Sequence, residues 1–153
     1  DWDVHHGNGT QHSFESDNSV FFFSIHQYPH YPGTGTASER GLGPGQGQTM
    51  NIPVHAGSAD TDYLVHFEQD LIPAIDQFKP EFILISAGFD AHRNDPLGQI
   101  RLSEEGYRAL TLHIRKLANR HCRGRLVSLL EGGYHLTSTA LSIEAHLQAL
   151  LAD

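Results

Sequence analysis

The sequence is poor in cysteine and in basic side chains. Its 153 residues include a single cysteine, Cys122, which excludes an intramolecular disulfide framework and any zinc site built from two or four cysteines. Only 10 basic side chains stand against 18 acidic ones. The resulting net charge of -8 argues against a surface that binds nucleic acid directly.

Long apolar runs are also missing. The longest are a few residues, too short to span a membrane, and no signal-peptide pattern opens the chain. These absences favour one soluble domain in a reducing compartment. We therefore expect a cytoplasmic protein, or a nuclear one in a eukaryote.

What the sequence does contain is an alternation of short apolar runs with helical patterns. The apolar runs predict strands at 20–25, 49–54, 82–87 and 125–130. The last two are typical of strands buried on both faces. The periodic segments predict helices over about 60–78, divided or kinked at Pro73, and over 103–124 and 137–152. This alternation predicts an α/β fold with a mainly parallel sheet.

Two segments do not follow that pattern. Residues 26–48 are rich in glycine and proline, and Tyr28 and Tyr31 within them favour an ordered binding loop. The first residues look like the end of a buried strand whose earlier part is absent. We therefore expect the chain to be the C-terminal part of a longer domain, truncated at its N-terminus.

Acidic and histidine side chains lie at the end of the opening extended segment and after the strand at 82–87. Asp3 and His5 can share one face of an extended segment, and Asp90 comes just after the strand at 82–87. Ligands of α/β sheets bind beyond the carboxyl ends of the strands. One histidine with two carboxylates is a ligand set of catalytic divalent-metal sites. The alternative is that Asp3 and His5 form a turn and Asp90 caps a helix.

Tyr134 follows another strand, directly after two glycines. Its hydroxyl could donate to an oxyanion formed when a carbonyl is attacked, or the side chain could be a half-buried core tyrosine. His92, His113 and His121 are interpreted as surface histidines, and Cys122 as an inert small side chain.

Several motifs follow one another along nearly the whole chain: DWDVHHGNGTQ (1–11), SIHQYPHYPGTG (24–35), GxGxGxxxNIPV (43–54), SAGFDAHRNDPLG (86–98) and LEGGY (130–134). As a set they resemble the histone deacetylase and acetylpolyamine amidohydrolase family, in its bacterial and class II-like branch. The resemblance implies a three-layer arginase/deacetylase fold around a mainly parallel sheet. Residues 1–153 would form the C-terminal portion of a single deacetylase domain.

The resemblance also implies roles for individual residues. The zinc ligands would be Asp3, His5 and Asp90, and the residue that stabilises the oxyanion would be Tyr134. A structural potassium ion would be bound by Asp1, Asp3, Ser24 and the backbone carbonyls of His5 and Ile25. The walls of the substrate tunnel would be Tyr31 and Leu97, and its floor Gly133.

One element of the family pattern is not in this chain. The general acid/base of the family is a tandem histidine pair upstream of Asp1. The sequence thus predicts a zinc-dependent amidohydrolase that removes acetyl or other acyl groups from lysine side chains of proteins such as histones, with this fragment inactive by itself. The alternatives are an acetylpolyamine amidohydrolase and a non-catalytic module that binds an acyl-lysine or a partner. The sequence does not indicate the oligomeric state.

Overall fold

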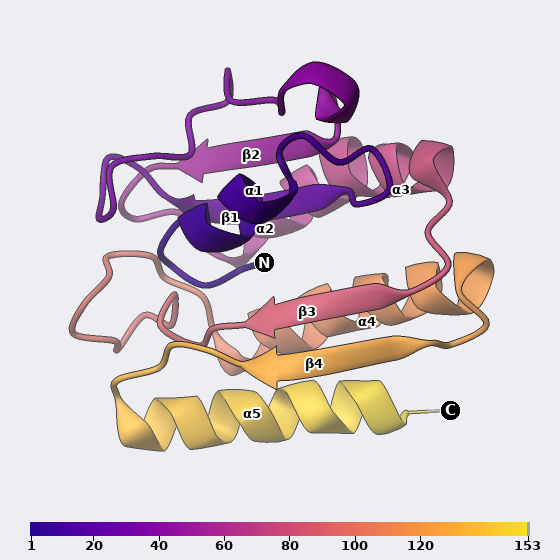
Figure 1. Cartoon of the computed structure of the whole chain (residues 1–153). Coiled ribbons are helices and arrows are strands. Elements are labelled where there is room, and N and C mark those ends of the chain that lie inside the picture. The colour runs from indigo at the N-terminus through magenta and orange to yellow at the C-terminus, as the bar shows by residue number, and fades with distance from the viewer. Residues whose placement is uncertain (153) are drawn as a thin grey trace.

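Four strands run parallel in two hydrogen-bonded pairs (Figure 1). The computed structural model describes residues 1–152. The strand β1 (Phe22–Gln27) pairs with β2 (Thr49–Val54), and β3 (Ile83–Ala87) pairs with β4 (Leu126–Leu130). The predicted α/β fold with parallel strands is therefore confirmed.

The opening segment, residues 1–4, lies between β1 and β3 and joins the two pairs. The amide of Ile25 donates to the carbonyl of Asp1 at 3.1 Å, and the amide of Trp2 donates to the carbonyl of Ser86 at 3.4 Å. The strands then lie in the order β2, β1, residues 1–4, β3 and β4. Their carboxyl ends all point to the left in Figure 1, so the loops that follow them meet at one edge.

The helices lie before, between and after the strands. They are α1 (Asn8–Phe14), α2 (Asp60–His66), α3 (Ile72–Phe78), α4 (Glu104–His121) and α5 (Leu136–Leu151), with a 3₁₀ turn η1 (Gly43–Gly45) and a π-helical turn η2 (Phe67–Leu71). The helical pattern over 60–78 is interrupted by the π-helical turn η2, which directly precedes the first turn of α3, where Pro73 lies. Helix α1 is not predicted by the sequence, since it is short and lacks an apolar stripe.

The core lies between the strands and the helices behind them. It contains Trp2, Val4, Ile25, Phe67, Ile85, Phe89, Tyr107, Leu110 and Leu117 among others. Helix α4 contributes one apolar face at helical spacing, and the hydroxyl of Ser103 caps the helix by accepting a hydrogen bond from the amide of Gly106. Burial of each large apolar side chain stabilises the fold by roughly 1.5–3 kcal/mol. This packing fixes the strand ends.

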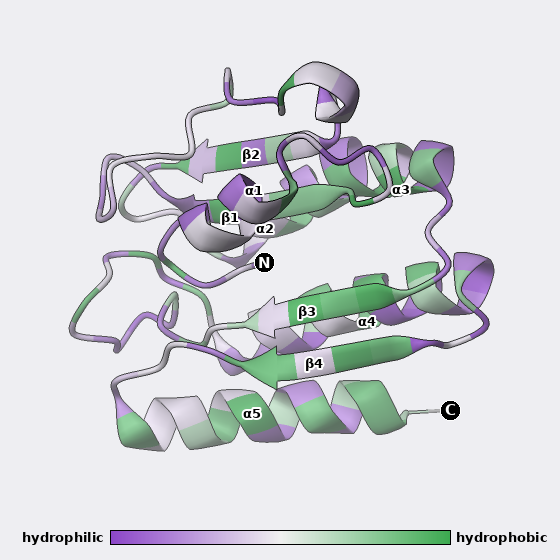
Figure 2. Cartoon of the chain, viewed as in Figure 1, coloured by the Kyte–Doolittle hydropathy of each residue, from purple (hydrophilic) through white to green (hydrophobic). Residues whose placement is uncertain are grey.

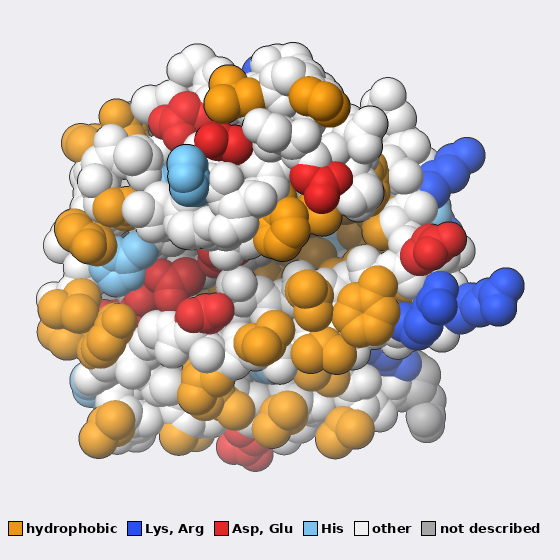
Figure 3. Space-filling view, in the orientation of Figure 1, with side chains coloured by type: hydrophobic (Ala, Val, Ile, Leu, Met, Phe, Trp, Pro, Cys, Tyr) orange, Lys and Arg blue, Asp and Glu red, His pale blue; other side chains and the backbone are white. Residues whose placement is uncertain are grey.

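The prediction that β3 and β4 are buried on both faces is wrong for the described residues. Leu84 of β3 is 66% exposed and Leu129 of β4 is 49% exposed. Much of both strands is hydrophobic in Figure 2, and hydrophobic side chains gather over them on the face shown in Figure 3. The reason is that α4 lies behind the strands and no described element covers the front (Figure 1). Among residues 1–152, no helix combines the length and hydropathy that crossing a bilayer requires.

Candidate active site

Asp3, His5 and Asp90 meet at the carboxyl edge of the strands. Each offers one ligand atom, and these atoms lie within 4.8 Å of one another. The Nδ1 atom of His5 is 3.0 Å from Oδ1 of Asp3 and 3.1 Å from Oδ2 of Asp90. The structure thus brings together residues that are 85 positions apart in the sequence, as the metal-site prediction requires. That they bind a metal remains a prediction.

Backbone amides and two glycines hold these carboxylates. The amide of Val4 donates to Oδ1 of Asp90 at 2.8 Å, and the amide of Gly132 donates to Oδ2 of Asp3 at 2.9 Å. A Cβ atom on Gly132 would overlap Oδ2 of Asp90, and one on Gly88 would lie 2.6 Å from the Cβ of Asp3. Only glycine fits at these two positions, because the backbone approaches the carboxylates closely.

The electrostatics of the three side chains are those of a cation site. Hydrogen bonds to Asp3 and Asp90 raise the pKa of His5 to about 10. Burial, together with the charge of Asp3, raises the pKa of Asp90 to about 6. Burial alone would raise the pKa of Asp3, but hydrogen bonds from His5 and Gly132 outweigh it and lower the value. Two carboxylates and one imidazole nitrogen directed to one point are nitrogen and oxygen donors that suit Zn²⁺.

Tyr134 lies beside this cluster, at the end of the loop that follows β4. Gly133 before it has a φ of 144°, a conformation that favours glycine. The side chain of Tyr134 is 51% exposed. Partial burial and the negative charges of Asp90, Asp3 and Asp95 raise its pKa. The hydroxyl therefore stays protonated at neutral pH and is able to donate a hydrogen bond.

The predicted tunnel residues Tyr31 and Leu97 lie in two exposed loops. The ring of Tyr31 meets the ring of His5 edge-on, with 6.1 Å between the ring centroids. His30 stacks on the same imidazole at 5.2 Å. Sequence reasoning missed His30, although its place in an aromatic loop beside Tyr31 was a usable signal. The two rings surround the His5 side chain and limit its rotation.

The residues predicted to bind potassium lie on two neighbouring segments, the opening residues and β1. Asp1, Asp3 and His5 line one cavity of about 240 Å³. Ser24 and Ile25 lie on β1 beside the opening residues: the amide of Ile25 donates to the carbonyl of Asp1 at 3.1 Å, and the hydroxyl of Ser24 forms a hydrogen bond with Nδ1 of His26. The potassium site remains a prediction.

A buried polar network fastens the loop at 26–48, which is ordered as predicted. The ring nitrogens of His6 form hydrogen bonds with Thr34 and Gln11, both at 2.8 Å. Gln11 in turn donates to Glu39, whose other carboxylate oxygen accepts the amides of residues 35 and 36. Sequence reasoning missed this network, because its members are distant in sequence and no local pattern shows that their side chains meet.

The histidines interpreted as surface residues are not exposed. His92 is buried beside Glu104, with 3.3 Å between Nε2 and the carboxylate, so that interpretation is wrong. His121 is half-buried, with 2.7 Å between its Nε2 atom and Oδ1 of Asp76. In each case an acidic side chain from another part of the chain packs against the imidazole ring. Cys122 is buried with its thiol directed to a carbonyl, as expected for an inert side chain.

A family model described as the histone deacetylase domain matches residues 1–150. The chain belongs to the histone deacetylase family. "Histone deacetylase 14, chloroplastic" of Arabidopsis thaliana is 45% identical over 153 residues, which are 100% of this chain and 36% of that protein. A "Probable deacetylase" of Archaeoglobus fulgidus is 47% identical over 134 residues, 88% of this chain and 37% of that protein. The chain thus spans little more than a third of these relatives.

Two solved structures, one of them described as a histone deacetylase, share this fold. The crystal structure of the HDA15 HD domain superposes with a TM-score of 0.93 at 42% identity, covering 99% of this chain and 43% of that one. The predicted deacetylase fold and the resemblance to the family are therefore confirmed.

Proposed function

We propose that this chain carries the metal-binding half of a zinc-dependent deacetylase, which removes acetyl groups from lysine side chains of proteins such as histones. The convergence of Asp3, His5 and Asp90 carries the proposal. Membership of the histone deacetylase family supports the reaction class.

The residues divide the chemistry between them. Asp3, His5 and Asp90 would hold the ion. A zinc ion, when bound, supplies Lewis acidity toward the amide carbonyl and toward water. The Tyr134 hydroxyl donates a hydrogen bond to the carbonyl oxygen as negative charge develops there, an interaction that strengthens in the transition state.

Tyr31 and Leu97 form apolar walls for the methylene arm of the acyl-lysine, and Gly133 leaves room at the floor. Walls of this kind exclude water and orient the amide toward the metal ligands. The ring of Tyr31 also contacts His5, so the wall and the ligand are coupled.

The proton-transfer groups belong to a part of the parent protein outside this chain. We propose that residues 1–153 are the C-terminal portion of one deacetylase domain, and that a tandem histidine pair upstream completes it. The chain spans little more than a third of the two relatives, so most of their length has no counterpart in it. The isolated chain is then inactive. A bound potassium ion and a cytoplasmic or nuclear location complete the proposal.

The deciding experiment uses the full-length parent protein loaded with zinc. Acetyl-lysine peptides, an acetylated polyamine and a non-hydrolysable acyl-lysine analogue are offered side by side. We expect the wild-type protein to hydrolyse the peptides. We expect the Asp90→Asn variant to lose both this activity and the bound zinc. Preference for the polyamine would assign a different substrate class, and binding of the analogue without any turnover would identify a binding module.

A further inference from the structure

We propose that Asp95 is a positioning residue that holds Tyr134 and Leu97 in one fixed relation. The inference rests on the proposed function, because it assigns Asp95 a task toward two residues that would contact the acyl-lysine. Among the described residues, the side chain of Asp95 forms hydrogen bonds with the backbone of these two residues and with none of the three candidate metal ligands.

The two carboxylate oxygens of Asp95 accept hydrogen bonds from these two residues. Oδ1 accepts the amide of Leu97 at 2.9 Å, and Oδ2 accepts the amide of Tyr134 at 2.8 Å. The first bond closes a local turn across Pro96, and the second spans 39 residues of sequence. One planar group therefore fixes both backbones.

The burial of Asp95 makes this arrangement rigid. The residue is 6% exposed, and among the described residues its carboxylate forms no ion pair. A buried charge must be balanced by hydrogen bonds, and bonds to a carboxylate are stronger than those between neutral groups. The two amides are the groups that satisfy it.

Tyr134 needs such a restraint more than most residues. It follows Gly132 and Gly133, and glycine gives the backbone many accessible conformations. Its side chain is half exposed, so packing alone fixes it weakly. Displacement of a catalytic group by about 1 Å lowers rates by on the order of a hundredfold.

A second connection ties the same two loops together. The side-chain amide of Asn94 donates to the hydroxyl of Ser138 at 3.1 Å. Ser138 lies in the first turn of α5, where His135 caps the helix through the amide of Ser138. The loop after β3 is thus anchored at the backbone of Tyr134 through Asp95 and at the start of α5 through Asn94.

The test uses Asp95→Asn in the full-length zinc-loaded enzyme. Asparagine keeps the size but offers one oxygen and one N–H₂ group, so one of the two amides faces a donor. We expect kcat to fall about tenfold to a hundredfold with zinc content unchanged. In the Tyr134→Phe background the same change should alter kcat by less than about twofold, because the group on which Asp95 acts is gone. The displacement of Leu97 should also raise KM, and this increase should persist in the Tyr134→Phe background.

Hydrogen–deuterium exchange provides a readout that does not depend on activity. The amides of Leu97 and Tyr134 should be protected in the wild-type protein and exchange faster in Asp95→Asn. The matched control is Asp62→Asn, since Asp62 also accepts a backbone amide but lies at the exposed start of α2. Asp95→Ser keeps a short acceptor for Leu97 alone, and should release only Tyr134.

The outcomes separate this inference from the proposed function. A wild-type enzyme that hydrolyses no acylated amine contradicts the proposed function, while the exchange data still decide the role of Asp95. Unprotected Leu97 and Tyr134 amides in the wild-type protein, or an undiminished effect of Asp95→Asn on kcat in the Tyr134→Phe background, would overturn the inference. The wild-type exchange result holds even if both Asp95 variants unfold.

Discussion

The carboxylate of Asp90 accepts a hydrogen bond from the backbone amide of Val4 at 2.8 Å, although 86 residues separate the two. Val4 belongs to the opening segment that carries Asp3 and His5, and Asp90 follows β3. The same contact that joins the opening segment to the loop after β3 therefore also sets the geometry of the three candidate ligands. The positions of the three candidate ligands therefore depend on the packing of the opening segment beside β3.

Substitution of Gly132 by alanine should damage metal binding. The added methyl group would overlap the carboxylate of Asp90 and lie 2.7 Å from Oδ2 of Asp3. Both carboxylates must then move, and we expect zinc affinity to fall at least about tenfold, as for loss of a supporting contact. Isothermal titration with zinc measures this directly.

Gly9→Ala is the matched control for that change. A Cβ atom at Gly9, within α1, meets nothing within 4 Å. This variant should bind zinc like the wild-type protein and be slightly more stable, since alanine favours a helix over glycine by roughly 1 kcal/mol. Equal zinc affinity of the two variants would contradict the close approach at Gly132.

The strands and the three candidate ligands could be anticipated from the sequence because their signals are local. Apolar runs mark β1 to β4, and the motifs around Asp3 and Asp90 each lie within a few residues. The contacts that fix the site are different in kind. The bonds of Asp95 to Tyr134 and of Gln11 to Glu39 join residues 39 and 28 positions apart. The periodicity of the sequence does not predict such pairs, because they depend on how the loops fold.

The burial of His92 and the exposure of Leu84 were unpredictable for the same reason. The exposure of a side chain depends on which other part of the chain packs against it. His92 is covered by Glu104 from the start of α4, whereas no described element covers Leu84. Residue type and strand pattern do not contain that information.

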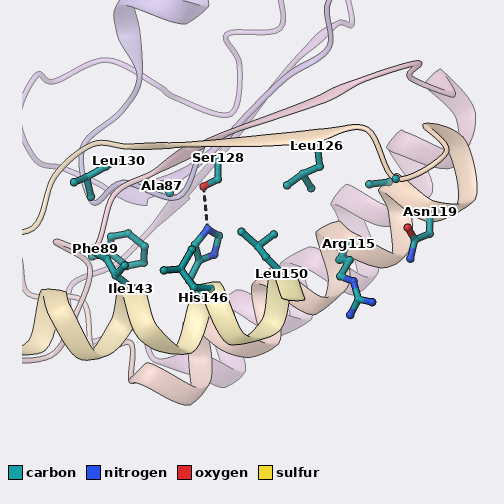
Figure 4. Close-up of a pocket in the computed structure, with 13 residues that line it drawn as sticks. Ala87, Phe89, Arg115, Asn119, Leu126, Ser128, Leu130, Ile143, His146 and Leu150 are labelled. Carbon is teal, nitrogen blue, oxygen red and sulfur yellow. Dashed lines mark hydrogen bonds between the residues drawn. The ribbon is translucent and has the colours of Figure 1, made fainter. Parts of the chain in front are cut away.

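The stability of the fold should fall as the pH is lowered from about 7 to 4, with His146 as one cause. His146 points from α5 to Ser128 of β4 (Figure 4), and its other ring nitrogen pairs with Thr111. Burial lowers the pKa of His146 to about 4, from an ordinary value of 6.5. Between these values the unfolded chain takes up a proton that the folded chain does not, so acid favours unfolding.

Urea unfolding at several pH values tests this dependence. His146→Phe keeps a ring against Trp2 and Phe89 but removes the titrating group. Its unfolding free energy should decline less steeply between pH 6.5 and 4 than that of the wild-type protein. Above pH 7 the difference between the two proteins should be constant. Parallel curves across the whole range would show that His146 does not contribute.

Glu39 should be the residue on which the order of the loop at 26–48 depends. One of its oxygens accepts the amides of Gly35 and Thr36 at 2.9 and 2.8 Å, and the other accepts Gln11 at 2.7 Å. Glu39→Gln replaces one acceptor by a donor, and we expect a loss of about 2 kcal/mol. Urea unfolding and exchange of residues 33–37 measure the effect. Glu105→Gln, at an exposed pair with Arg108, should cost under about 1 kcal/mol.

The open apolar face over β3 and β4, formed by Phe82, Leu84, Val127 and Leu129, should bind an apolar fluorescent dye in the 153-residue chain. Contiguous exposed apolar surface of this kind is rare on monomers, whereas single exposed apolar residues are common. Leu84→Ser combined with Leu129→Ser should therefore reduce dye fluorescence severalfold, with circular dichroism unchanged. Leu42→Ser removes an isolated exposed leucine and should leave the fluorescence as it is. Equal fluorescence of all three proteins would mean that this face is covered in solution.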